Sequence, residues 1–105
     1  MVKHVNSKEL EQLISSTDKA VFCDFWASWC GPCRMLAPVF EELSEKYEGK
    51  AEFVKVDVDE NEDSAMKYRI SSIPNVTAFK KGQPVDSNLG FVPAAVLEDF
   101  IKNNL

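Results

Sequence analysis

The sequence has too few cysteines and histidines for a fold held together by disulfides or zinc. Three of its 105 residues are cysteine and one is histidine. Three cysteines cannot all pair within one chain, so a complete disulfide framework is excluded. Structural zinc takes four ligands, usually from two short motifs, and here one short cysteine motif is joined only by Cys23 and His4. We therefore expect no metal site.

Long apolar runs and an excess of positive charge are also missing. The apolar stretch from Ala20 to Cys23 ends at Asp24, well short of the roughly 20 residues that a membrane helix needs. The first residues contain no apolar run of signal-peptide length, so we expect a cytoplasmic protein in a compartment that keeps thiols reduced. A net charge of −5 disfavours nucleic acids and anionic membranes as partners.

The residues that are present indicate one α/β domain over residues 1–105. Hydrophobic residues make up 45% of the chain, and no repeat or linker divides it. Segments with strand and helix patterns alternate, which favours a layered α/β fold. The nearly continuous apolar segment 20–26 is typical of a central strand covered on both faces. The expected strands are 2–5, 20–26, 53–58, 75–79 and 85–89, and the expected helices are 6–14, 32–47, 59–68 and a last one opened by Pro93.

Apolar residues at helical spacing predict which helix faces are buried. Asn6 is followed by Glu9 three residues later, which predicts a capping box at the start of the first helix. The residues expected to face inward are Leu10, Leu13 and Ile14 in the first helix, Met35, Leu36, Val39, Phe40 and Leu43 in the second, and Val96, Leu97, Phe100 and Ile101 in the last.

The motif Trp29-Cys30-Gly31-Pro32-Cys33 lies between the expected central strand and the helix after it. Residues three apart in a first helical turn share one face and are close enough for a disulfide. A helix N-terminus stabilises a thiolate, so Cys30 is the expected nucleophile. Pro32 suits the first turn, because its missing N–H would have no partner there.

Three other interpretations of the cysteines fit the sequence less well. A purely structural disulfide would close a loop of two residues and so add little stability. Zinc lacks a second ligand pair. A protease-like nucleophile needs a partner imidazole, and His4 is far away in the sequence.

Asp24 is the candidate base. It is the only ionisable residue in segment 20–26, and burial there would raise its pKa toward neutrality. Cys33, one turn into the helix, is expected to lie deeper than Cys30 and therefore to need a base to form its thiolate. The alternative is a structural aspartate bonded to nearby backbone.

Four features in order resemble the thioredoxin family over essentially the whole chain: the run 24–33, Ile73-Pro74, the segment 79–82 and Gly90. The resemblance implies the thioredoxin fold, with a mixed five-stranded sheet flanked by four helices. It also implies a general protein-disulfide reductase, in which Cys30 forms a mixed disulfide with the substrate and Cys33 resolves it.

The resemblance also implies roles for the neighbouring residues. Gly31 and Pro32 tune the redox potential, and Asp24 accepts the proton of Cys33. Pro74 is cis and leaves the backbone of Ile73 free for substrate. Lys55 pairs with the Asp24 carboxylate, although it could also be an ordinary solvated lysine. The expected docking face is Trp29, Gly31, Pro32, Ile73, Pro74 and Gly90, with Trp26 packed beneath it.

The resemblance implies no bound cofactor, because electrons come from NADPH through the FAD of thioredoxin reductase. Expected substrates are proteins of the peroxiredoxin, ribonucleotide reductase and methionine sulfoxide reductase types, and the chain is expected to be a monomer. Cys23, Asn75 and Phe91 stand where the family more often has valine, threonine and alanine. We expect Cys23 to be buried and inert, whereas Asn75 and Phe91 could alter partner choice. The rival functions are a binding scaffold with an incidental cysteine pair and an oxidase or isomerase of the secretory pathway.

Overall fold

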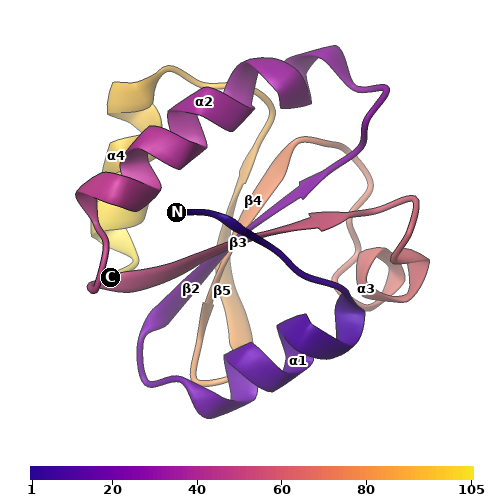
Figure 1. Ribbon diagram of the computed structural model, residues 1–105, viewed down its shortest axis with the longest axis horizontal. Coiled ribbons are helices and arrows are strands. Elements are labelled where there is room, and N and C mark those ends of the chain that lie inside the picture. Colours follow the sequence, from indigo (N-terminus) through magenta and orange to yellow (C-terminus); the bar gives the residue numbers. More distant parts are fainter.

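The computed structural model describes residues 1–105 as one five-stranded sheet covered by helices on both faces (Figure 1). The four helices lie in two pairs, α2 with α4 and α1 with α3, on opposite sides of the sheet. The elements in chain order are β1 (Lys3–His4), α1 (Ser7–Ser16), β2 (Ala20–Trp26), α2 (Gly31–Lys46), β3 (Ala51–Asp57), α3 (Glu62–Lys67), β4 (Asn75–Lys80), β5 (Gln83–Leu89) and α4 (Ala94–Asn103). None of the helices is long and apolar enough to cross a membrane.

The strand order β1-β3-β2-β4-β5 makes the sheet mixed. Strands β1, β3 and β2 run parallel, whereas β4 is antiparallel to β2 and β5 is antiparallel to β4. The central strand β2 is buried along nearly its whole length, as its apolar sequence predicted. This placement puts Asp24 in the middle of the sheet, opposite Lys55 on one side and Val76 on the other.

Alternate residues of β2 supply two separate cores. Phe22 packs with residues of α2 and α4, and Cys23 packs on the opposite face with residues of α1. A third, small cluster contains Ala27, Cys30 and Cys33, with Trp26 packed against it. The sheet thus supports the cysteine pair on the face that α2 covers.

Two residues expected inside the protein are exposed. Met35 is 58% exposed and Val96 is 48% exposed. Each lies one residue before a fully buried leucine, Leu36 or Leu97, and one residue turns a helix by about 100°. Both side chains are therefore rotated off the buried stripe.

Helix α3 is shorter than the expected 59–68. Side chains close a turn in place of its first residues. The backbone N–H of Asp59 donates to Oδ1 of Asp57 at 2.9 Å, and Nδ2 of Asn61 donates to the carbonyl of Asp57 at 3.0 Å. The helix begins only at Glu62.

The predicted capping box at the start of α1 is present. Oδ1 of Asn6 accepts the N–H of Glu9 at 2.8 Å, and Oε1 of Glu9 accepts the N–H of Asn6 at 2.9 Å. We expect Asn6→Ala to lower the free energy of unfolding by about 1 kcal/mol, because the backbone N–H of Glu9 loses its side-chain acceptor. Urea denaturation measures this change. Asn103→Ala is the control, since Asn103 is exposed at the end of α4; an equal loss there would contradict a capping effect.

Candidate active site

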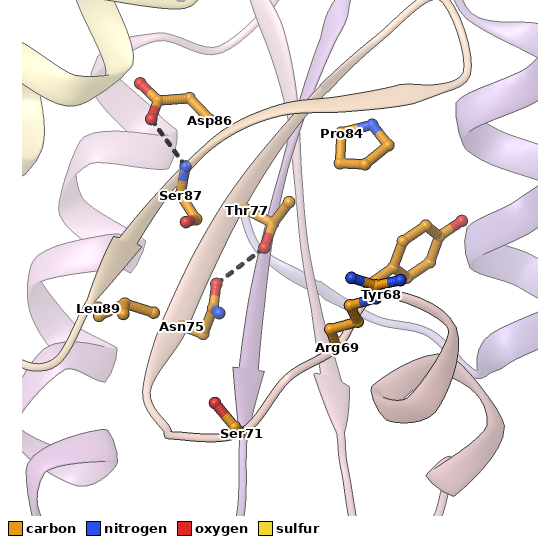
Figure 2. A pocket seen from close by; sticks show the side chains of 9 residues that line it. All are labelled: Tyr68, Arg69, Ser71, Asn75, Thr77, Pro84, Asp86, Ser87 and Leu89. Atoms are coloured by element: carbon orange, nitrogen blue, oxygen red, sulfur yellow. Dashed lines mark hydrogen bonds between the residues drawn. The ribbon is translucent and has the colours of Figure 1, made fainter.

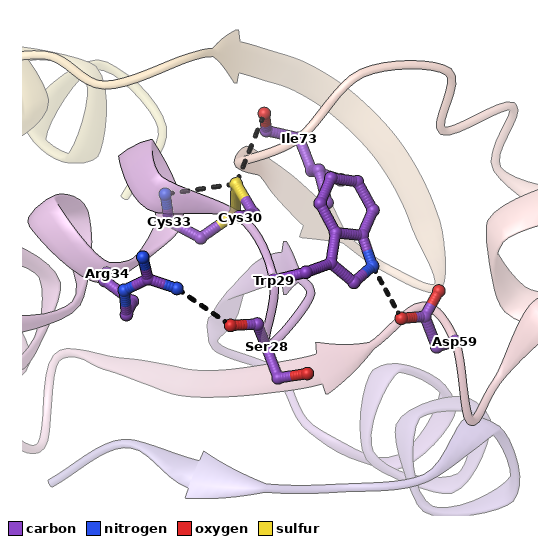
Figure 3. Close-up of a disulfide and its surroundings, with 7 residues drawn as sticks. All are labelled: Ser28, Trp29, Cys30, Cys33, Arg34, Asp59 and Ile73. Atoms are coloured by element: carbon purple, nitrogen blue, oxygen red, sulfur yellow. Dashed lines mark hydrogen bonds between the residues drawn. A yellow bond between two sulfur atoms is a disulfide. The ribbon is translucent and has the colours of Figure 1, made fainter.

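The two cysteines form a disulfide at the N-terminus of α2, where the sequence placed them. Their Cα atoms are 5.2 Å apart. Cys30 is the N-cap residue, and its Sγ accepts the backbone N–H of Cys33 at 3.2 Å (Figure 3). A negative charge on Cys30 would meet this N–H and the positive end of the helix dipole. Cys33 lies inside the first turn and lacks the cap position.

Burial does not separate the two cysteines as strongly as expected. Cys30 is 4% exposed and Cys33 is 2% exposed. The stronger difference is in their neighbours: Sγ of Cys30 lies 3.9 Å from the carbonyl oxygen of Ile73 and next to Trp29, which is 68% exposed. Cys30 is therefore the sulfur at the rim of the exposed face.

Two contacts that the sequence did not reveal hold the loop before α2. Nε1 of Trp29 donates to Oδ2 of Asp59 at 2.8 Å, and Nη1 of Arg34 donates to the carbonyl of Ser28 at 2.9 Å. In Figure 3 the indole of Trp29 extends from the cysteines toward Asp59. This bond fixes the orientation of the most exposed aromatic side chain beside the disulfide.

The segment at Pro74 faces the disulfide. The Ile73–Pro74 peptide bond is cis, as expected. The carbonyl of Pro74 accepts the N–H of Gly90 at 2.8 Å, which places Gly90 beside this segment. Ile73 lies outside the strands, and neither its N–H nor its carbonyl pairs with another backbone group. The side chain of Pro74 is buried, so the surface here is formed mainly by its neighbours.

No cavity opens at the disulfide. Neither cysteine lines any of the four hollows in the surface. Trp29 and Pro32 are exposed, and Gly31, Ile73 and Gly90 are half-buried. The surface around the disulfide is therefore formed by exposed and half-buried residues, without an enclosing pocket.

Asp24 is completely buried, and neither of its carboxylate oxygens accepts a hydrogen bond from the protein. The alternative of a structural aspartate bonded to nearby backbone is therefore wrong. Burial raises the pKa of Asp24 to about 6, although the positive charge of Lys55 opposes the shift. A carboxyl group with this pKa can take up and release a proton near neutral pH.

The expected pairing of Lys55 with the Asp24 carboxylate is not present. The two salt bridges of the structure join Lys46 to Glu98 and Lys67 to Glu11. Nζ of Lys55 instead lies 4.5 Å from the ring centroid of Trp26. Lys55 thus acts on Asp24 through its field alone.

The remaining cysteine and the histidine lie away from the disulfide. Cys23 is fully buried on the α1 face of β2, and burial raises the pKa of its thiol. His4 is exposed on β1, with its ring edge-on to Trp26 at a centroid distance of 5.9 Å. No three His, Cys, Asp or Glu side chains are grouped so that they could hold a metal ion.

The chain is similar to known proteins in sequence and in fold. The family model described as Thioredoxin matches residues 1–103. The thioredoxins of Staphylococcus aureus strains Mu50 and MW2 are each 55% identical over 82 residues, which is 78% of this chain and 79% of theirs. A solved structure described as an initial structural analysis of Plasmodium falciparum thioredoxin superposes with a TM-score of 0.91. It is 39% identical and covers 99% of this chain and 100% of its own.

Proposed function

The chain belongs to the thioredoxin family and is a thiol–disulfide oxidoreductase that works through Cys30 and Cys33, and on this basis we propose a role for each residue of the site. The Cys30 thiolate attacks one sulfur of a protein disulfide, and the other substrate sulfur leaves as a thiolate. Cys33 then attacks the sulfur of Cys30, which releases the second substrate sulfur and closes the Cys30–Cys33 disulfide. The substrate gains two electrons, and the dithiol loses them.

The hydrogen bond from the N–H of Cys33 to Sγ of Cys30 is the observation that carries this assignment. It gives Cys30 a donor and the positive end of the helix dipole, both of which favour a thiolate. Gly31 and Pro32 separate the two sulfurs and tune their redox potential. Pro32 occupies the first turn, where its missing N–H leaves no unsatisfied donor.

Asp24 serves as the base that takes the proton of Cys33. Three observations support this role. Asp24 lies in β2 on the face that α2 covers, between Phe22 and Trp26. Trp26 packs against the cluster that contains both cysteines. The raised pKa, about 6, suits proton transfer near neutral pH, and Lys55 keeps it from rising further.

The substrate chain docks over the face around the disulfide. The backbone N–H and carbonyl of Ile73 pair with no other backbone group, so they can pair with an extended substrate segment, as an exposed strand edge does. The exposed indole of Trp29 supplies apolar contact. The remaining contacts come from Gly31, Pro32, Pro74 and Gly90.

The proposed partners are those of a cytoplasmic thioredoxin. A thioredoxin reductase that carries FAD and uses NADPH reduces the Cys30–Cys33 disulfide. The substrates are disulfide-containing proteins of the peroxiredoxin, ribonucleotide reductase and methionine sulfoxide reductase types. The chain acts as a monomer, without a bound cofactor and without nucleic acid or membrane as partner.

A coupled assay tests the function against the rival scaffold role. Purified protein is mixed with NADPH, thioredoxin reductase and a disulfide-bonded protein substrate, and NADPH consumption is followed. We expect many turnovers per molecule, and the same rate for Cys23→Ala, because Cys23 lies in the opposite core. Partner binding without turnover would favour a scaffold, and loss of turnover in Cys23→Ala would contradict the assignment to Cys30 and Cys33.

A further inference from the structure

A second feature lies next to the docking face, on the side of β4 and β5 that faces away from α4. It is a hollow of about 360 Å³, which we name the β4–β5 pocket (Figure 2). Asn75 lines it, and this residue directly follows Pro74 in the chain. One residue of the pocket lining is therefore adjacent in the chain to the segment that faces the disulfide. The lining comes from the segment after α3 and from β4 and β5, and it includes Tyr68, Arg69, Asn75, Thr77, Asp86 and Ser87.

The floor of the β4–β5 pocket carries an oriented hydrogen-bond donor. Asn75 and Thr77 are each only 5% exposed. The hydroxyl of Thr77 donates to Oδ1 of Asn75 at 2.8 Å, and Figure 2 shows this bond at the centre of the pocket. Because Oδ1 of Asn75 is engaged, the amide presents its Nδ2 group as the available donor.

The lining of the β4–β5 pocket holds one positive side chain, Arg69, and one negative side chain, Asp86. Arg69 is exposed and takes part in neither of the two salt bridges of the structure. Asp86 is the only carboxylate in the lining, and both of its oxygens are engaged, by the N–H of Ser87 at 2.9 Å and by Nδ2 of Asn104 at 3.0 Å. Glu11, which is bonded to the Tyr68 hydroxyl, is neutralised by Lys67.

The backbone of Arg69 gives no reason for an arginine at this position. Its φ is +55°, in the left-handed region that favours glycine and costs another residue about 1 kcal/mol. The only other non-glycine residue with positive φ is Lys81, at +52° in the turn between β4 and β5. The local conformation would favour glycine at residue 69, so the chain carries the guanidinium there at a cost in stability.

We propose that the β4–β5 pocket binds an acidic side chain of the disulfide-bearing substrate. Arg69 would pair with the carboxylate through its planar guanidinium, and Nδ2 of Asn75 would donate to the same group. A substrate segment that pairs with Ile73 passes within two residues of Asn75, so an acidic residue near the reacting cysteine can reach the pocket. The inference rests on the proposed docking at Ile73 and adds to it a preference for acidic sequences.

Paired disulfide peptides test the preference. The two peptides of a pair differ only in Glu or Gln at one position, and that position is moved in turn along each flank of the disulfide. The parent protein should reduce the best-placed Glu peptide with a kcat/KM about three- to tenfold higher than its Gln partner, as expected for one partly exposed charge pair. In Arg69→Gly this ratio should fall close to one, mainly through a higher KM, without loss of thermal stability.

Lys81→Gly is the matched control. It removes one positive charge and relaxes one positive φ, as Arg69→Gly does, but Lys81 lies outside the pocket, in the turn between β4 and β5. Lys81→Gly should keep the preference of the parent, and high salt should weaken that preference.

Three outcomes overturn the inference: no Glu preference in the parent at any position, equal loss of preference in both variants, or an effect of Arg69→Gly confined to reduction by thioredoxin reductase. Failure of the parent to reduce the Gln peptides would instead contradict the proposed function, independently of the pocket.

Discussion

Replacing Cys33 with serine is expected to turn the protein into a covalent trap for its substrates. Cys30 keeps its cap position in the variant, together with the backbone N–H that approaches its sulfur. The first attack therefore still forms a mixed disulfide, but no second sulfur is present to resolve it. Turnover should fall by a factor on the order of 10³ or more, as is usual when a nucleophile is removed. Mass spectrometry under non-reducing conditions would detect the adduct on Cys30.

Cys30→Ser is the matched variant, since it also leaves a single cysteine at the start of α2. It should show an equal loss of turnover but no adduct. The exposed fractions of the two cysteines, 4% and 2%, are too similar to decide which sulfur attacks first. The comparison of the two variants decides it. Adducts through Cys33 in Cys30→Ser, with none in Cys33→Ser, would reverse the roles proposed here.

The fold was predictable from the sequence wherever one pattern dominates a segment. The continuous apolar run gave the bounds of β2 correctly, and the capping box marked the start of α1. Errors fell on residues beside a buried stripe, such as Met35 and Val96, because an apolar side chain can lie on either side of the boundary. The start of α3 was also missed, since side-chain bonds to Asp57 replaced its first turn.

The site was predictable where its residues are neighbours in the chain. The spacing of Cys30 and Cys33 and the ionisable residue in an apolar strand both follow from local sequence. The bond from Trp29 to Asp59 spans 30 positions, and nothing in the acidic segment around Asp59 marks it as a partner. The place of Arg69 in the β4–β5 pocket could not be predicted either, because only the fold brings this residue beside β4 and β5.

Asp24→Asn should stabilise the oxidised protein at neutral pH and slow the resolution of the mixed disulfide by Cys33. In the parent, burial raises the pKa of Asp24 from 3.8 to about 6. The folded state therefore holds its proton between these pH values, whereas the unfolded chain has released it. The free energy of unfolding of the parent should fall as pH rises through this window, by up to about 3 kcal/mol at completion.

Asparagine has nearly the shape of protonated aspartic acid but cannot ionise. The variant and the parent should therefore have similar stability below pH 3.8. The variant should become increasingly the more stable of the two as pH rises from 3.8 to about 6, and its advantage should stay constant above that pH. Urea denaturation of the oxidised proteins at a series of pH values measures the difference. Glu60→Gln is the control, because it removes a carboxylate from an exposed position, and its stability difference from the parent should stay small at every pH.

The kinetic effect of Asp24→Asn separates a base from a group that merely destabilises the fold. Without a carboxylate to take its proton, Cys33 resolves the mixed disulfide more slowly, so the adduct on Cys30 should accumulate transiently during turnover. The rate of the first attack should change little, because that thiolate depends on the N-terminus of α2. If the variant lost the pH dependence of stability but accumulated no adduct, Asp24 would be a buried ionisable group that does not act as the base for Cys33. A variant that kept the pH dependence would show that another group titrates in this window.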